Sequence, residues 1–284
     1  MESVFDKNLY EKKHLIVVNS SSAAETIKAT LDYIESTDNT GVVYIDFAFD
    51  AHPFPKEYTE PSIRAINKEF YYKNSSCLTD VFCEFLKVDL NNFERITVWH
   101  GNRTSDLMFL YFFADYYGKP FYVVDIAKHV EQPEVVDLSD LSLKDLVRLL
   151  GKEILLTQKD VDYYRLNAYR LRVNDTGYHG LDKNGFIVNI LPEEFTKAYM
   201  DVIDDHGGEV LLARMMNRLL SGEMRYCSLD LLEKILLYLL ITETLKAYWS
   251  ANNTAMYPEE YNYHIVKSSF PKEFNYQRVI IRSK

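Results

Sequence analysis

The sequence lacks the glycine-rich signatures with which many nucleotide-binding folds hold phosphate. Only 10 of its 284 residues are glycine. It contains neither a G-x-G-x-x-G segment after the first apolar run nor a G-x-x-x-x-G-K-[ST] segment. The G-x-S-x-G elbow, the H-E-x-x-H helix and the EF-hand spacing are absent too. These absences argue against a dinucleotide site or a P-loop nucleotide site.

Cysteine and long apolar runs are also scarce. Cys77, Cys83 and Cys227 show no C-x-x-C spacing, which predicts neither a disulfide framework nor a zinc site. The seven histidines are scattered without ligand spacing, so we expect no metal site. The segment Met1–Lys13 is charged and lacks the apolar core of a secretory signal. The most apolar run, Ile235–Ile241, is far shorter than a membrane span, so we expect a cytoplasmic protein without a membrane partner.

The charge balance is acidic. There are 42 acidic and 32 basic residues, with a formal net charge of -10. Such a chain is not attracted to a phosphate backbone in general, which makes nucleic acid an unlikely partner. The composition leaves a homo-oligomer open and indicates no particular cofactor, which stays unknown.

Short apolar runs alternate with helical stretches in the first half of the chain. This alternation predicts an α/β fold with a mainly parallel, Rossmann-like sheet and flanking helices over residues 1–130. A stretch around Pro133, between Lys128 and Asp140, reads as a linker. The pattern then becomes helical, which predicts a mainly helical C-terminal domain over residues 140–284. The four predicted strands are Leu15–Val18, Val42–Ile45, Ile96–Trp99 and Phe121–Val124.

Three serines follow the first predicted strand. Ser22 and Glu25 have the S-x-x-E spacing of a capping box, which predicts that a helix begins there. Backbone amides, hydroxyl groups and the helix dipole at such a position can hold an anion, so Ser20, Ser21 and Ser22 are candidate ligand-binding residues. The alternative is that one serine caps the helix and the others fill the turn.

The end of the third strand carries a second group of candidates. His100 follows Trp99 directly, and its pKa range suits proton transfer, which makes it the candidate catalytic residue. Trp99, Asn102 and Asp106 are candidates for ligand contacts nearby. If Trp99 is buried, alternation along the strand turns His100 to the other side, and we expect His100 to face an open cleft. The alternative is a hydrogen-bonded histidine with a structural role.

Other charged residues are possible ligand contacts. Asp46 and Asp125 end two further strands, where they could bind ribose hydroxyls or cap a turn. Arg64, on a predicted crossover helix, could clamp a phosphate or pair with a neighbouring acid. The sequence leaves these alternatives open.

Four stretches of the chain carry a family resemblance: residues 17–24, 98–102 with Asp106, 164–168 with 171–172, and 190–194. They resemble an uncharacterised bacterial family, domain of unknown function 1835 followed by domain of unknown function 3658. In that family the first loop usually reads Gly-Asp-Ser, where this chain has Ser20-Ser21-Ser22, and Asp106 stands where a longer acid is usual. The resemblance implies a two-part layout with a site between the first and third strand loops.

The sequence therefore predicts a protein that binds a small phosphorylated or nucleotide-like ligand at the strand ends of its α/β domain. Whether it also turns that ligand over is left open. The alternative is a regulatory or adaptor module whose helical half binds protein or, less favourably, DNA. A winged-helix arrangement over Leu229–Ile281 would support that alternative.

Overall fold

The computed structural model describes residues 5–6, 8–35, 39–70, 76–129, 138, 141–173, 175–182, 184–222, 224–249, 254–256 and 279–283, with backbone only at 67–70 and 76–78. Most of the predicted linker lies outside these ranges, and so does the side chain of Cys77.

A five-stranded sheet with the order β2-β1-β3-β4-β5 forms the centre of the first half. The first four strands are parallel, whereas β5 runs antiparallel to β4. All four predicted strands are present, each within two residues of its expected bounds. The strands are β1 (His14–Val18), β2 (Thr40–Tyr44), β3 (Arg95–His100), β4 (Phe121–Asp125) and β5 (Ile154–Leu156).

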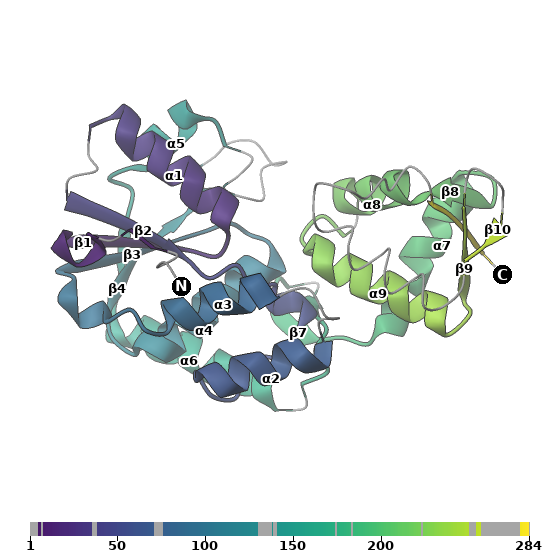
Figure 1. Ribbon diagram of the computed structural model, residues 1–284, viewed down its shortest axis with the longest axis horizontal. Coiled ribbons are helices and arrows are strands. Elements are labelled where there is room, and N and C mark those ends of the chain that lie inside the picture. Colours follow the sequence, from purple (N-terminus) through teal and green to yellow (C-terminus); the bar gives the residue numbers. More distant parts are fainter. Residues whose placement is uncertain are drawn as a thin grey trace.

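Helices cover both faces of this sheet (Figure 1). On one face lie α1 (Ser21–Tyr33) and α5 (Leu143–Leu149), and on the other α3 (Ser76–Phe85), α4 (Thr104–Tyr117) and α6 (Gln158–Arg172). Helix α2 (Glu60–Phe70) packs against α3. Short 3-10 helices occupy Leu9–Glu11 (η1), Phe49–Ala51 (η3), Leu90–Asn92 (η4) and Ile126–Lys128 (η5).

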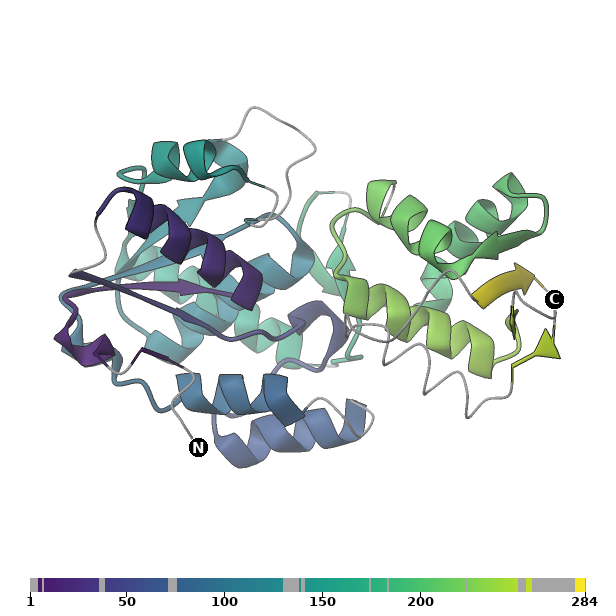
Figure 2. The same cartoon turned by 45° about the horizontal axis from the view of Figure 1, so that its top comes forward.

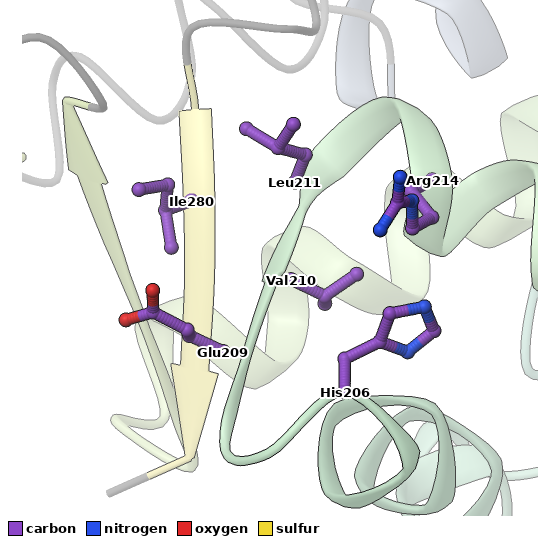
Figure 3. Close-up of a pocket in the computed structure, with 6 residues that line it drawn as sticks. All are labelled: His206, Glu209, Val210, Leu211, Arg214 and Ile280. Carbon is purple, nitrogen blue, oxygen red and sulfur yellow. The ribbon is translucent and has the colours of Figure 1, made fainter.

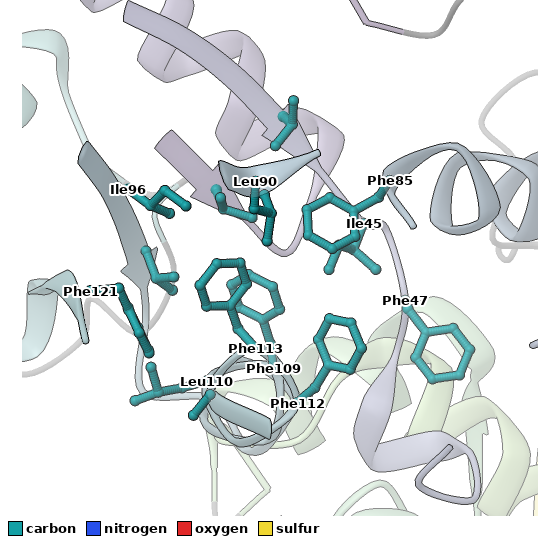
Figure 4. Packing of buried hydrophobic residues seen from close by; sticks show 14 of the residues in the cluster. Ile45, Phe47, Phe85, Leu90, Ile96, Phe109, Leu110, Phe112, Phe113 and Phe121 are labelled. Carbon is teal, nitrogen blue, oxygen red and sulfur yellow. The ribbon is translucent and has the colours of Figure 1, made fainter. Parts of the chain in front are cut away.

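The two faces of the sheet bury different side chains. The face under α1 and α5 packs small and aliphatic residues around Trp99. The opposite face is rich in aromatic rings, and α4 contributes Phe109, Phe112 and Phe113, each 0% exposed (Figure 4). Phe113 packs edge-on against Phe121 with ring centroids 5.0 Å apart, a favourable aromatic geometry. The aromatic run of α4 is therefore core.

The first hydrophobic core extends beyond the boundary predicted at residue 130. Strand β5 joins the first sheet, and Val161, Ala168 and Leu171 of α6 belong to the same buried cluster as the α4 phenylalanines. Arg172 reinforces this packing because its guanidinium lies 2.6 Å from the Asp115 carboxylate on α4. The end of the alternating pattern thus does not coincide with the end of the first core. The three-residue strand β5 is too short to show a period.

The second half combines helices with a sheet and a hairpin, so the structure does not show the mainly helical domain that the sequence predicts. A hairpin forms between β6 (His179–Leu181) and β7 (Ile187–Asn189). A separate antiparallel sheet has the order β10-β9-β11-β8, and its strands are two to five residues long. The elements after the hairpin are η7 (Pro192–Phe195), α7 (Thr196–Asp205), β8 (Glu209–Leu211), α8 (Leu212–Ser221), α9 (Leu229–Ile241), β9 (Leu245–Trp249), β10 (Thr254–Ala255) and β11 (Val279–Ser283).

Among the described residues, this element order resembles that of a winged helix. Helix α7 precedes the short strand β8, and helices α8 and α9 follow it. Strand β11 pairs with β8 on one side and with β9 on the other. The two halves lie side by side, and the start of α9 points toward the first half (Figure 2). Ala51 of η3 is buried in the core of the second half, so the halves share packing.

Candidate functional site

The carboxyl ends of β1 and β3 form the candidate site. The chain passes from β1 outward to β2 and then crosses to β3 on the other side of β1. The strand order therefore reverses between β1 and β3, which are direct neighbours with Val17 opposite Val98. In open parallel sheets, ligands bind outside the carboxyl ends of the strands at this reversal. The site implied by the sequence therefore lies at the expected place in the fold.

The serine loop opens helix α1, but a different serine caps it. The Ser20 hydroxyl accepts a hydrogen bond from the Ala23 amide at 3.2 Å, and the helix begins at Ser21. The predicted cap at Ser22 is wrong: this side chain is exposed, and its hydroxyl lies 3.3 Å from that of Ser20. The alternative weighed for this loop, one capping serine beside turn residues, therefore holds for Ser20.

Asp46 lies against the start of α1. Its amide donates to the Asn19 carbonyl at 2.6 Å, and its carboxylate accepts from the Ser21 amide at 3.4 Å. The backbone has a φ of 57°, a left-handed conformation that is uncommon outside glycine. Burial raises the pKa of Asp46, while the bonds from Ser21 oppose that rise. The ends of β1 and β2 are thus joined, with a carboxylate beside the free amides of α1.

His100 is buried, so the expectation that it faces an open cleft is wrong. It is 4% exposed, and its Nδ1 lies 2.8 Å from the Gly101 carbonyl. A carbonyl only accepts hydrogen bonds, so Nδ1 carries the proton and Nε2 is the acceptor of the neutral ring. Burial lowers the pKa of His100, and the nearby Asp125 opposes that change. Trp99 packs in the α1 face as the alternation predicts.

Several buried polar atoms at this edge have no hydrogen-bond partner within the described part of the chain. They are Asn19 Oδ1, Trp99 Nε1, Asn102 Oδ1 and Thr104 Oγ1. The amide group of Asn19 donates to the Ser105 hydroxyl at 3.2 Å, and that hydroxyl donates in turn to the Phe47 carbonyl. This chain of donors fixes Asn19 with its oxygen unpaired. Such atoms are rare in folded proteins because each costs free energy.

The second half brings further acids to the same edge. The Tyr226 carbonyl accepts a hydrogen bond from the Thr104 amide at 2.8 Å, so the segment before α9 touches the β3 loop. Asp230, in the first turn of α9, is partly buried, and its pKa is raised to about 6 by burial and by the charges of Asp50 and Asp46. No described residue forms a hydrogen bond or ion pair with its carboxylate.

Sequence reasoning missed Asp50, Asp230 and Ser228. Asp50 is fully buried, and its carboxylate accepts from both the amide (2.7 Å) and the hydroxyl (2.6 Å) of Ser228. These residues are 178 positions apart, and no local pattern announces such a contact. The only available sequence signal was Ser228, which stands as a capping residue directly before the apolar helix α9.

Three other charged candidates have structural partners. Arg64 pairs with Glu60 at 2.8 Å and with Asp80 at 2.9 Å, and its helix lies on the opposite side of the sheet from α1 (Figures 1 and 2). The structure therefore does not bring Arg64 to the candidate site. Asp125 accepts from the Ala127 amide at 3.1 Å and caps a turn. Asp106 lies in the first turn of α4, near the loop.

A small cavity lies elsewhere, in the second half (Figure 3). It measures about 210 Å³ and is lined by His206, Glu209, Val210, Leu211, Arg214 and Ile280. Nδ1 of His206 donates to the Val202 carbonyl at 2.7 Å, and Glu209 pairs with Arg282 at 2.7 Å. Most of its polar groups therefore have protein partners or face solvent.

Comparisons with known proteins add no relative. No protein-family model and no curated protein matches the chain. The likeness to the bacterial family stays a prediction. Within the described ranges, no group of three or more histidine, cysteine, aspartate or glutamate side chains could hold a metal ion. No helix in those ranges is long and apolar enough to cross a membrane.

Proposed function

We propose that the chain binds a small phosphorylated or nucleotide-like ligand over the carboxyl ends of β1 and β3. The single observation that carries this proposal is the reversal of strand order between these two strands. The start of α1 adds free backbone amides and the positive end of a helix dipole, which favour an anionic group. The second half covers the same edge through Tyr226 and Asp230.

Asp46 favours a ligand that places hydroxyl groups beside its carboxylate. An acid near the end of β2 is placed to accept hydrogen bonds from ribose hydroxyls, as in dinucleotide-binding folds. Asp230 faces the same region closely enough for the charge of Asp46 to raise its pKa. Two carboxylates repel a multiply charged anion but accept from hydroxyls. The ligand is therefore a nucleoside or sugar with a single anionic group directed at α1.

The unpartnered oxygens of Asn19, Asn102 and Thr104 supply further acceptors. A ligand that carries amine or hydroxyl donors recovers the free energy that these atoms lose in the closed structure. Because the atoms are buried, binding requires the segment before α9 to move. Ligand entry and the contact between the two halves are thus coupled in this proposal.

His100 is the candidate for proton transfer if the ligand is turned over. Its neutral ring offers Nε2 as proton acceptor, while Nδ1 is held by the Gly101 carbonyl at 2.8 Å. The lowered pKa keeps the ring neutral at physiological pH. Replacement by Gln separates the roles: binding without turnover marks proton transfer, and loss of affinity alone marks a contact role.

The alternative is a regulatory module that binds DNA. The winged-helix element order favours it, but the position of the recognition helix argues against it. The second helix of a helix-turn-helix pair enters the major groove. Here that helix is α9, whose Leu231, Ile235 and Leu239 pack in the core of the second half. Lys234 donates instead to the carbonyls of Ala51 and Gly177 at 2.8 and 2.7 Å. Helix α9 docks onto the first half, which argues against insertion into DNA.

Thermal unfolding in the presence of adenosine, AMP, ADP, ribose 5-phosphate and inorganic phosphate tests the proposal. A ligand at 100 times its dissociation constant stabilises the folded state by about 2.7 kcal/mol, which gives a clear rise in melting temperature. We expect the monophosphates to stabilise more than phosphate alone. Asp46→Ala should weaken binding of the best ligand about tenfold, the loss of one charge-assisted hydrogen bond.

Arg64→Ala is the matched control. It removes a charged residue of the same domain that lies across the sheet from α1, and it should leave the ligand-induced shift unchanged. No shift with any member of the panel, or equal losses in the two variants, would show that the site is not at the β1–β3 edge.

A further inference from the structure

The outward face of α6 exposes large apolar side chains to solvent. Tyr163, Leu166, Tyr169 and Val173 are each between 48% and 62% exposed. The opposite face is fixed on α4 through Val161, Ala168 and Leu171 and through the ion pair of Arg172 with Asp115. The orientation of α6 is thus set. On its exposed side, Asp162 and Arg170 have partners only within α6 itself among the described residues: Gln158 and Arg165 for Asp162, and Asn167 for Arg170.

These residues form one stripe. At about 100° per residue, positions 159, 162, 163, 166, 169 and 170 all lie within about 60° of Leu166, and Val173 follows directly after the last residue of the helix. We call them the α6 stripe. Residues of a solvated helix on this side are normally polar, but the α6 stripe alternates apolar and charged groups. Such a pattern is typical of a helix that packs against another helix.

The charges of the α6 stripe are complementary to those of a second copy of the stripe. Asp162 lies four residues before Leu166 and Arg170 lies four residues after it. If two copies of α6 cross antiparallel about a twofold axis at Leu166, position 162 of one copy meets position 170 of the other. The same operation brings position 163 beside position 169. Each copy then supplies one acid and one base to two identical ion pairs, with tyrosines beside them.

We propose that the α6 stripe is a homodimer interface, in which two copies pack α6 antiparallel around Leu166. The chain as a whole carries a net charge of -10, which opposes self-association. The α6 stripe itself contains two basic residues, Lys159 and Arg170, and one acidic residue, Asp162. Two copies of this face therefore do not repel each other as the acidic chain as a whole does. The proposal does not depend on the ligand site, which lies at a sheet edge rather than on α6.

The expected dimer is weak. A single 15-residue helix pair buries less surface than the roughly 1,600 Å² of a standard stable interface. Sedimentation velocity of the full chain at up to about 100 μM is therefore the appropriate measurement, because it covers micromolar dissociation constants. The wild-type chain should show a concentration-dependent dimer.

Charge reversal gives the decisive test. Asp162→Arg and Arg170→Asp each create two like-charged pairs across the axis, and each should abolish the dimer. The double variant Asp162→Arg/Arg170→Asp restores opposite charges and should dimerise again. The two single variants, when mixed, should form a heterodimer. Arg218→Asp on α8 makes the same charge change on an exposed residue outside the stripe and should leave the dimer intact.

Melting temperatures of all variants confirm that each is folded. The changed side chains are exposed, so these temperatures should stay close to that of the wild type. A wild-type chain that is monomeric at 100 μM overturns the proposal. Single variants that dimerise like the wild type, or a double variant that fails to recover the dimer, overturn it as well.

Discussion

Two groups of buried polar residues lie at the junction of the halves, and they differ in how well their hydrogen bonds are satisfied. In the first, Asp50 accepts twice from Ser228, and Lys234 donates to the carbonyls of Ala51 and Gly177. In the second, Asn102 Oδ1 and Thr104 Oγ1 lack partners, and Asp230 has none among the described residues.

The difference separates attachment from recognition. A hydrogen-bonded network offsets part of the free energy that is spent on taking its charges out of water, and breaking it by removing one partner is costly, so it can hold the halves together. An unsatisfied group costs free energy in the folded state, and a ligand that supplies the missing partner gains what the protein lacks. The Asp50 network is therefore the structural contact, and the strand edge is the candidate binding site.

The largest effect is expected for Asp50→Ala. The change removes a buried carboxylate that accepts two bonds, at 2.7 and 2.6 Å, and leaves the Ser228 amide without its partner. It should lower the free energy of unfolding by about 3 kcal/mol, as for hydrogen bonds to a charged group. Urea unfolding measures this value. Asp46→Asn, which keeps a side chain that tolerates the left-handed backbone and weakens one bond of 3.4 Å, is the control and should cost less than 1 kcal/mol. Equal costs would erase the distinction between the two groups.

Lys234→Met should have the next largest effect. Met retains most of the apolar stem but leaves the carbonyls of Ala51 and Gly177 without a donor. We expect the free energy of unfolding to fall by about 2 kcal/mol. The effect is smaller than for Asp50→Ala because burial disfavours the charged form of Lys234 and lowers its pKa to about 8. Lys246→Met, at an exposed position of β9, should change stability by less than 0.5 kcal/mol. A neutral result for Lys234→Met would mean that this amine does not hold the halves together.

Asp230→Asn should have the opposite sign. The folded-state pKa of about 6 lies above the ordinary 3.8, so the folded protein holds this proton more tightly than the unfolded chain. The wild type therefore loses stability as the pH rises from about 4 to about 6, whereas the Asn variant does not. A shift of about two units corresponds to roughly 3 kcal/mol. Partial exposure and the favourable position at a helix start reduce this, so we expect about 1 kcal/mol of stabilisation at pH 8.

Unfolding of the Asp230→Asn protein at pH 4 and pH 8 checks this sign. The stability difference from the wild type should be near zero at pH 4 and reach its full size at pH 8. A variant less stable than the wild type at pH 8 would show that Asp230 has a favourable partner and belongs to the satisfied group.

The smallest effect distinguishes the serines of the loop. Ser20→Ala removes the acceptor for the Ala23 amide and should cost about 1 kcal/mol, while Ser22→Ala should cost less than 0.5 kcal/mol. Thermal unfolding without ligand measures both. The reverse order would mean that Ser22, as the capping box predicted, closes the helix.

The strands and helices of the first half could be predicted because their periods are long and clear. The bounds of β1, β3 and α4 follow from apolar runs and from the residues that end them. Strands β5 and β8 are three residues long and carry no period, which explains why the sequence pattern shows neither the fifth strand of the first sheet nor the sheet of the second half. The candidate edge was placed by fold rules, but the burial of His100 depends on neighbours that those rules do not describe.

The sequence by itself determined the local elements of this protein, because helix periodicity, strand alternation and capping are set by residues close in the chain. It also determined that Ser20 to Ser22, Asp46 and His100 would stand at strand ends. Only the tertiary structure decided which groups meet there: Asp46 with Ser21, Asp50 with Ser228, and Asp230 with the charges of both acids. Contacts across 178 residues arise from packing of the two halves, which no local pattern encodes.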